Sequence, residues 1–139
     1  MRLLLDTNVL VAAFVARGHC TDLLERAVQA HRLISSRPLL EELRTVLGGK
    51  LRQHDSDVRQ TLRWCEATFM LVEPETLGSQ VCRDRGDDLV LATALAGNCR
   101  VIVTGDQDLL VLDPFGAIRI LAPAAFWPWE AGGEPPPKR

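Results

Sequence analysis

The sequence predicts an α/β fold, a three-layer α/β/α arrangement with a central parallel sheet of about five strands. Three observations predict it. Short apolar runs alternate with longer segments of helical pattern along most of the chain. Polar cap residues, proline or glycine separate these segments. Strands joined through helices pair in parallel by right-handed crossovers, so helices cover both faces of the sheet.

The expected strands are short and apolar. A strand buried on both faces of a parallel sheet carries apolar residues without alternation, and residues 2–5 and 101–103 have this character. The five expected strands are residues 2–5, 33–34, 71–73, 101–103 and 117–121.

The expected helices follow residues that cap helix N-termini. Ser, Thr, Asp and Asn side chains accept hydrogen bonds from the free amides of the first turn, proline suits that turn, and glycine ends helices. The expected helices are 9–15 after Asp6-Thr7-Asn8, 22–30 after Thr21, one from Ser36 to Gly48-Gly49, one from 55 or 56 to about 70, about 87–96, and a short one from Pro123.

Composition indicates one globular domain. The chain has 139 residues, of which 47% are hydrophobic and 24% charged. Residues 1–129 form the expected domain. Residues 130–139 are rich in proline and glycine, and this composition predicts a disordered tail. The apolar N-terminal run is broken by Asp6, which argues against a signal peptide or a membrane span and favours a cytoplasmic location.

The net charge of −2 provides no global basic field for nucleic acid, so any contact needs a local patch. Five basic residues of the middle region could be a solvated face or a rim that steers phosphate groups; they are Arg44, Lys50, Arg52, Arg59 and Arg63. The four cysteines form no C-x-x-C pair, so free thiols are expected.

Two aspartates follow predicted strands. Asp6 comes directly after residues 2–5, and Asp106 comes shortly after residues 101–103. Ligands bind at the carboxyl ends of parallel strands, so chemistry is expected there. A helix-cap or turn role would explain each aspartate alone, but Asp6 also needs a counter-charge, and no basic residue lies close after it in sequence.

Helical phase brings further acids to the same region. In the predicted helix from Ser36, Glu42 lies at the edge of the apolar stripe and Glu41 nearly opposite it, so Glu42 should face inward. Asp87 and Asp88 begin a helix that is apolar on every side, so periodicity does not distinguish them. The helix macrodipole alone could explain an acid at that position.

Clustered carboxylates without a counter-charge resist ionising together. Mg²⁺ or Mn²⁺ would resolve this repulsion, because hard divalent ions take oxygen ligands and keep several waters. One or two such ions could activate a water and stabilise the leaving oxygen of a phosphodiester. The acids therefore predict a metal centre for phosphodiester chemistry.

These motifs, in this order, resemble the PIN-domain family of metal-dependent ribonucleases over nearly the whole chain. The closest likeness is to the toxins of type II toxin–antitoxin modules of the VapC kind. The motifs that carry the resemblance are D-T-N-V-L from Asp6, Glu42-Leu43, Cys82-Arg83-Asp84, Asp87-Asp88, Leu91-Ala92-Thr93-Ala94 and Thr104 to Leu110.

The resemblance implies that Asp6, Glu42, Asp87 and Asp106 are the catalytic, metal-binding acids. Asp88 and Asp108 remain possible ligands beside their neighbours. The resemblance also implies that Asn8 orients Asp6, and that Thr104 holds a metal-bound water or a neighbouring carboxylate.

The function implied is endonucleolytic hydrolysis of RNA by a metal-activated water, with Mg²⁺ or Mn²⁺ as cofactor. A cognate antitoxin protein and a homodimer are the expected partners. The alternative is a non-catalytic PIN-fold module that binds RNA or protein. The presence of all four acids argues against this alternative.

Overall fold

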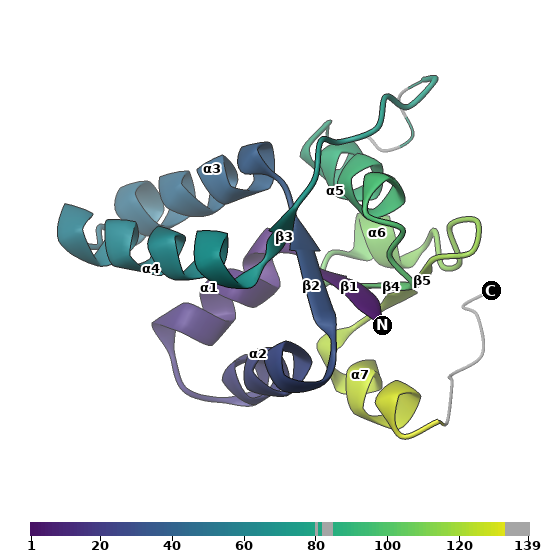
Figure 1. The fold of residues 1–139 in the computed structure, drawn as a ribbon, viewed down its shortest axis with the longest axis horizontal. Coiled ribbons are helices and arrows are strands. Elements are labelled where there is room, and N and C mark those ends of the chain that lie inside the picture. The colour runs from purple at the N-terminus through teal and green to yellow at the C-terminus, as the bar shows by residue number, and fades with distance from the viewer. Residues whose placement is uncertain (80, 82–84, 133–139) are drawn as a thin grey trace.

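A five-stranded parallel sheet lies between two groups of helices in this computed structural model, which describes residues 1–79, 81 and 85–132 (Figure 1). All four strand pairings are parallel, so the predicted α/β class and three-layer arrangement are confirmed. The strands are β1 (Arg2–Leu5), β2 (Arg32–Ser35), β3 (Met70–Leu71), β4 (Val101–Val103) and β5 (Arg119–Leu121).

The strand order is β3-β2-β1-β4-β5. The chain therefore moves outward from β1 through β2 to β3, and then returns to the other side of β1 to form β4 and β5. The order reverses between β1 and β4, and the crevice outside the carboxyl ends of two such strands is where open α/β sheets bind ligands. Leu5 pairs with Val103 at this point, and the amide of Asp6 extends the ladder by donating to the Val103 carbonyl at 2.9 Å.

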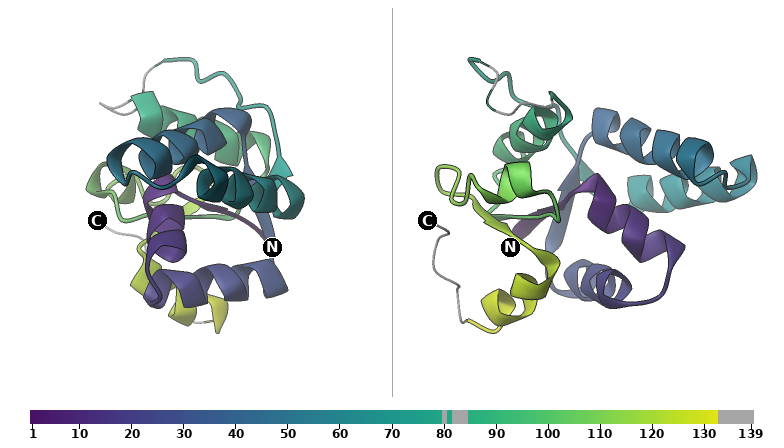
Figure 2. Two further views of the ribbon diagram at one scale, coloured as in Figure 1. Left: turned by 90° about the vertical axis from the view of Figure 1, so that its left-hand side faces the viewer. Right: turned by 180° about the vertical axis from the view of Figure 1, so that it is seen from behind.

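Helices connect the strands and cover both faces of the sheet (Figures 1 and 2). The helices are α1 (Thr7–Val15), α2 (His19–Ala30), α3 (Arg37–Thr45), the π-helical turn η1 (Val46–Lys50), α4 (Asp55–Thr68), α5 (Arg85–Ala96), α6 (Gln107–Leu110) and α7 (Pro123–Glu130).

Alternate side chains of the central strands supply two apolar cores. Leu3 and Val103 pack on the face covered by α1, α2, α4 and α7. Leu4 and Ile102 pack on the opposite face, against α5 and α6. Both faces of β1 and β4 are thus buried, which explains why their sequences are apolar without alternation.

Two strands are shorter than predicted. β3 covers Met70–Leu71 rather than 71–73, because it extends only as far as its pairing with Ile34 and Ser35 of β2. β5 begins at Arg119 rather than at residue 117, because Ile118 forms an antiparallel bridge with Phe115 instead of pairing with β4. The length of each edge strand is set by the strand beside it. The residues of the edge strand alone therefore do not predict where it ends.

Two helix ends also differ from expectation. Thr21 does not cap α2, which begins at His19; its hydroxyl donates to the carbonyls of Ala13 and Ala16 at 3.0 and 2.9 Å and so joins α2 to the end of α1. α3 does not end at Gly48-Gly49, because the chain continues as η1 through both glycines to Lys50.

The predicted helix from Pro123 is confirmed as α7, which lies beside α2 (Figure 2). Phe126 anchors it in the core with no exposed surface. The helix ends at Glu130, where the predicted tail begins, and the Glu130 carboxylate accepts hydrogen bonds from Arg26 and bonds His31 Nε2, each at 2.9 Å. Residues 133–139 lie outside the described residues.

Three cysteines are free thiols, Cys20, Cys65 and Cys99, while Cys82 lies outside the described residues. Burial raises the pKa of the Cys65 and Cys99 thiols to about 12, so neither is a reactive thiolate at neutral pH. Within residues 1–79, 81 and 85–132, no helix is long and apolar enough to cross a membrane.

Gly97 provides a test of the packing between α5 and β2. A Cβ atom at this position would overlap Cγ2 of Ile34 and lie 3.2 Å from its Cγ1. Ile34 is only 2% exposed and cannot move aside. We expect Gly97→Ala to lower the free energy of unfolding by about 1–3 kcal/mol in urea denaturation, because overpacking displaces buried atoms.

The matched control is Gly49→Ala in η1, where an added Cβ meets no atom within 4 Å. This variant should equal the unsubstituted chain or gain up to about 1 kcal/mol from helix propensity. Equal stability of Gly97→Ala and Gly49→Ala would contradict the close contact of α5 with β2.

Candidate functional site

Asp6 stands at the carboxyl end of β1 and caps α1. One carboxylate oxygen, Oδ1, accepts the Thr7 amide at 2.7 Å, and the other, Oδ2, accepts the Thr104 hydroxyl at 2.7 Å. Its backbone carbonyl accepts the amides of Val9 and Leu10 in the first turn of α1. A buried strand before it and an apolar helix after it leave the residue only 6% exposed, so its carboxylate is fixed in one orientation.

The environment of Asp6 favours its protonated form. Burial raises the pKa of the carboxyl group, and the negative charge of Asp106 raises it further. The hydrogen bonds from Thr104 and Thr7 lower the pKa but do not cancel the effect of burial, so the net direction is upward. In the absence of a cation, an ionised Asp6 is therefore a source of instability.

Thr104 joins the ends of β1 and β4. The side chain is fully buried; its hydroxyl donates to Asp6, and its oxygen accepts the Asp106 amide at 3.0 Å. Asp106 in turn caps α6, because its Oδ1 accepts the Asp108 amide at 2.9 Å. One hydroxyl therefore fixes the positions of two acids. Of the two predicted roles of Thr104, the structure shows contact with a neighbouring carboxylate.

Glu42 reaches the same region from α3. It lines the pocket described below, whereas Glu41 is exposed and pairs with Arg44 at 2.6 Å on the outer face of the helix. The prediction from helical phase, Glu42 inward and Glu41 outward, is confirmed. The buried residues Leu39 and Leu43 set this phase, since they attach α3 to the core.

The structure distinguishes Asp87 from Asp88 in the first turn of α5. Asp87 is 7% exposed and lines the same pocket as Asp6. Asp88 points elsewhere: its carboxylate accepts the Val81 amide at 3.0 and 3.2 Å and borders a separate depression beside Pro74. Of the two acids that the sequence left open, Asp87 lines the pocket with Asp6, and Asp88 lines the separate depression.

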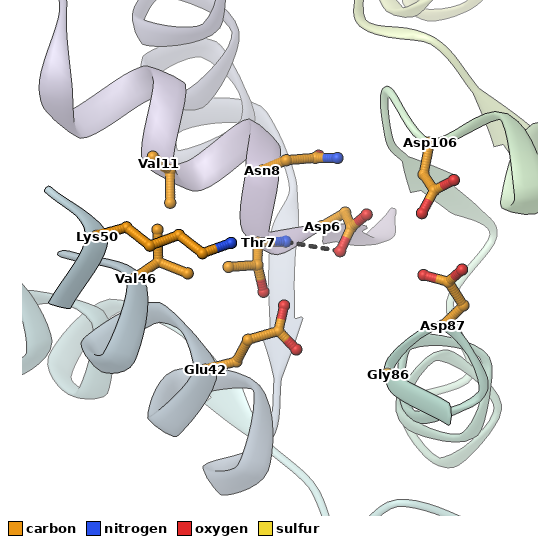
Figure 3. A pocket seen from close by; sticks show the side chains of 10 residues that line it. All are labelled: Asp6, Thr7, Asn8, Val11, Glu42, Val46, Lys50, Gly86, Asp87 and Asp106. Carbon is orange, nitrogen blue, oxygen red and sulfur yellow. Dashed lines mark hydrogen bonds between the residues drawn. The ribbon is translucent and has the colours of Figure 1, made fainter. Parts of the chain in front are cut away.

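The four predicted acids thus line a single pocket of about 390 Å³ (Figure 3). Its lining residues are Asp6, Thr7, Asn8, Val11, Glu42, Val46, Lys50, Gly86, Asp87 and Asp106. In Figure 3, Asp6, Asp87 and Asp106 face one another, and Glu42 lies across the pocket from Asp106.

The acids can serve as ligands for a hard divalent cation. Asp87, Asp106 and Asp108 each offer a carboxylate oxygen, and these three oxygens lie within 4.8 Å of one another. An all-oxygen set of this kind suits Mg²⁺ or Mn²⁺. Asp108, which the sequence left as a possible ligand, therefore belongs to the cluster with Asp106 rather than replacing it.

Asn8 lines the pocket from the exposed side of α1. Among the residues that the structure describes, no hydrogen bond joins Asn8 to Asp6; Thr104 and the Thr7 amide fix that carboxylate instead. The orienting role of Asn8 stays a prediction. Asn8 adds a neutral polar group to the pocket wall.

Sequence reasoning missed the part of the wall formed by Val46 and singled out Lys50 only as one of five basic residues. Val46 follows Glu42 by four residues, the spacing of one helix face, and this spacing was the available signal for Val46. No such signal marks Lys50, which lies in η1. Of the five basic residues, only Lys50 lines the pocket.

Comparison with known proteins gives a family and a fold. Residues 2–108 match the PIN domain family. Part of the motif that suggested this family, Cys82-Arg83-Asp84, lies outside the described residues. A search of curated protein sequences found no match.

Three solved structures share the fold at low identity. VapBC2 from Rickettsia felis, bound to a promoter DNA fragment, is 15% identical with a TM-score of 0.61, covering 88% of this chain and 98% of that one. VapBC-1 from nontypeable Haemophilus influenzae is 17% identical with a TM-score of 0.63, covering 89% and 99%. FitAcB from Neisseria gonorrhoeae is 18% identical with a TM-score of 0.54, covering 88% and 98%.

The raised pKa of Asp6 predicts how the metal-free protein depends on pH. The folded state binds this proton more tightly than the unfolded state, so stability falls as pH rises above the ordinary aspartate value of 3.8 and levels off above the folded-state pKa. Asp6→Asn removes this loss. We expect the variant to melt a few degrees higher than the unsubstituted chain at pH 7 in EDTA, with the difference shrinking toward pH 4.

Asp22→Asn is the matched control, because Asp22 is exposed in the first turn of α2. At that position the negative charge interacts favourably with the helix dipole, so its loss should lower the free energy of unfolding by about 0.3–1 kcal/mol. A lower melting temperature for Asp6→Asn at pH 7 would show that the Asp6 charge serves helix α1 rather than a cation.

Proposed function

This chain belongs to the PIN domain family, and from that premise we propose that it is a metal-dependent endoribonuclease that hydrolyses RNA phosphodiester bonds. One observation carries the proposal: Asp6, Glu42, Asp87 and Asp106 line one pocket at the point where the strand order reverses. They come from four different elements, so their convergence is a property of the fold and not of any one helix cap.

Bound Mg²⁺ or Mn²⁺ would supply a water of lowered pKa and positive charge next to a phosphate group. Asp87, Asp106 and Asp108 would hold the ion, since their oxygens already lie within 4.8 Å of one another. Asp6 and Glu42 would complete the acidic wall from β1 and α3. Thr104 would keep Asp6 in position and, through the Asp106 amide, hold the two strand ends together.

The burial of Asp6 and Asp87 also supports the proposal. Carboxylates that are 6% and 7% exposed lose most of their hydration, and a positive charge in the pocket would restore the lost stabilisation. Rigid strands and helices on each side keep the ligand oxygens close to the geometry that an ion needs. A site of this kind costs stability when it is empty and gains it when it is loaded.

We further propose that the chain is the toxin of a type II toxin–antitoxin module and acts in the cytoplasm. The resemblance of its motifs to VapC toxins supports this, as does the shared fold with VapBC2 and VapBC-1. A cognate antitoxin and a homodimer are the proposed assemblies. An apolar depression formed by α1, α2 and α4, where Val28 and Trp64 are 37% and 39% exposed, offers surface for a protein partner.

Replacing Asp87 should abolish cleavage of RNA. Asp87→Asn keeps the shape of the side chain but removes an anionic oxygen from the cluster, so we expect kcat/KM with Mn²⁺ to fall by more than about 100-fold. The measurement is cleavage of a mixed single-stranded RNA pool, with Mn²⁺ or with EDTA.

Asp88→Asn is the control, because it makes the same chemical change one residue away and outside the pocket. It should retain activity within about threefold, since the amide oxygen of Asn can still accept the Val81 bond. Cleavage that persists in EDTA would refute metal dependence, and an unsubstituted chain that cleaves no RNA with Mn²⁺ would favour a non-catalytic binding module.

Expression in a bacterial host tests the toxin proposal separately. The unsubstituted chain should arrest growth when it is expressed alone, because its RNA substrates lie in the cytoplasm. Asp87→Asn should permit growth at an equal level of protein, and Asp88→Asn should arrest it. Equal growth of all three strains would leave the nuclease proposal standing but contradict toxicity.

A further inference from the structure

Lys50 is the basic residue that lines the acidic pocket. Figure 3 shows its side chain extended along the pocket wall with the ammonium group directed toward Thr7 and Asp6. In the described part of the chain it makes no ion pair within 4.0 Å. A positive charge is thus placed beside four acids without being neutralised by direct contact with any of them.

The π-helical turn η1 brings Lys50 to this position. In a continuing α-helix, at about 100° per residue, residue 50 would lie about 80° around the axis from Glu42. The amide of Leu51 instead bonds the Val46 carbonyl at 3.1 Å, five residues back, which widens the turn. Each residue then advances by a smaller angle, so Lys50 rotates back toward the face that carries Glu42 and Val46.

Two other basic side chains near this region have carboxylate partners on the protein. Arg44 pairs with Glu41 at 2.6 Å, and Arg59 pairs with Asp55 at 3.6 Å. Their charge is therefore partly neutralised, and neither lines the acidic pocket. The remaining arginines of the predicted basic face, Arg52 and Arg63, are exposed but also lie outside the pocket lining.

We propose that Lys50 binds a phosphate group of the RNA and so positions the strand for cleavage; this inference rests on the proposed function. A cation bound by the acids repels the ammonium group, so in the loaded site the partner of opposite charge is the phosphate backbone. Lysine suits this role because its compact charge on a flexible stem can follow a phosphate without demanding one fixed geometry.

The proposal predicts two effects of opposite sign for Lys50→Gln. Without RNA, loss of a positive charge beside the metal site should leave Mn²⁺ affinity unchanged or raise it up to severalfold, because charge repulsion is removed. With RNA, loss of a phosphate contact should raise KM about tenfold across RNA sequences while kcat stays within about threefold. Calorimetric titration with Mn²⁺ and cleavage of single-stranded RNA measure the two effects.

Two further variants isolate the charge from the shape of the turn. Lys50→Arg keeps the positive charge and should restore KM to within about threefold of the unsubstituted chain. Arg63→Gln removes an equal charge from α4, where the side chain borders a different depression, and should change KM by no more than about twofold. The slope of log KM against log salt should fall by about 0.7 for Lys50→Gln alone.

Three results would overturn the inference. Unchanged KM and salt slope in Lys50→Gln would show that no phosphate is bound, and weaker Mn²⁺ binding in that variant would show that Lys50 supports the metal site. Failure of Lys50→Arg to restore KM would show a structural role. If the unsubstituted chain cleaves no RNA, the proposed function fails, and RNA affinity measured with Mn²⁺ decides this inference: weaker binding of Lys50→Gln supports it, and equal binding overturns it.

Discussion

The structure depends on one buried carboxylate, that of Asp6, at the carboxyl end of the middle strand of the sheet. Asp6 extends β1, caps α1 and accepts the Thr104 hydroxyl from the end of β4. The first and third of these contacts link β1 to β4, the two strands between which the strand order reverses. Burial makes the charge unfavourable by itself, so the same residue that organises the backbone also creates a demand for a cation. Asp6 therefore both stabilises the local backbone and favours a cation in the pocket.

The other acids of the pocket add negative charge and so make a bound cation still more favourable. Asp87 and Asp106 face Asp6 from α5 and from the turn after β4, and Glu42 faces it from α3. Natural proteins accept such repulsion at functional sites, where local stability is given up for a geometry that a ligand completes. The apolar cores on both faces of the sheet, with Leu3 and Leu4 fully buried on opposite sides of β1, supply the stability that the empty pocket lacks.

Irregular backbone also shapes the pocket. η1 continues α3 past two glycines and places Lys50 on the wall, while α6 is a single turn that Asp106 caps. Both features lie beside the acids. A wider helical turn and a short capped turn each re-aim one or two side chains without altering the sheet that positions the rest.

Much of this protein was determined by the sequence alone. Apolar runs and cap residues specify the five parallel strands, and helical phase specifies Glu42 over Glu41, because both depend on residues close together in the chain. Tertiary structure decided the rest. The Val81 amide holds the Asp88 carboxylate away from the pocket that Asp87 lines, and the neighbours of β3 and β5 set the lengths of those strands. These outcomes depend on partners that are distant in the sequence. Local patterns, such as the apolar helix that follows Asp87 and Asp88, therefore could not predict them.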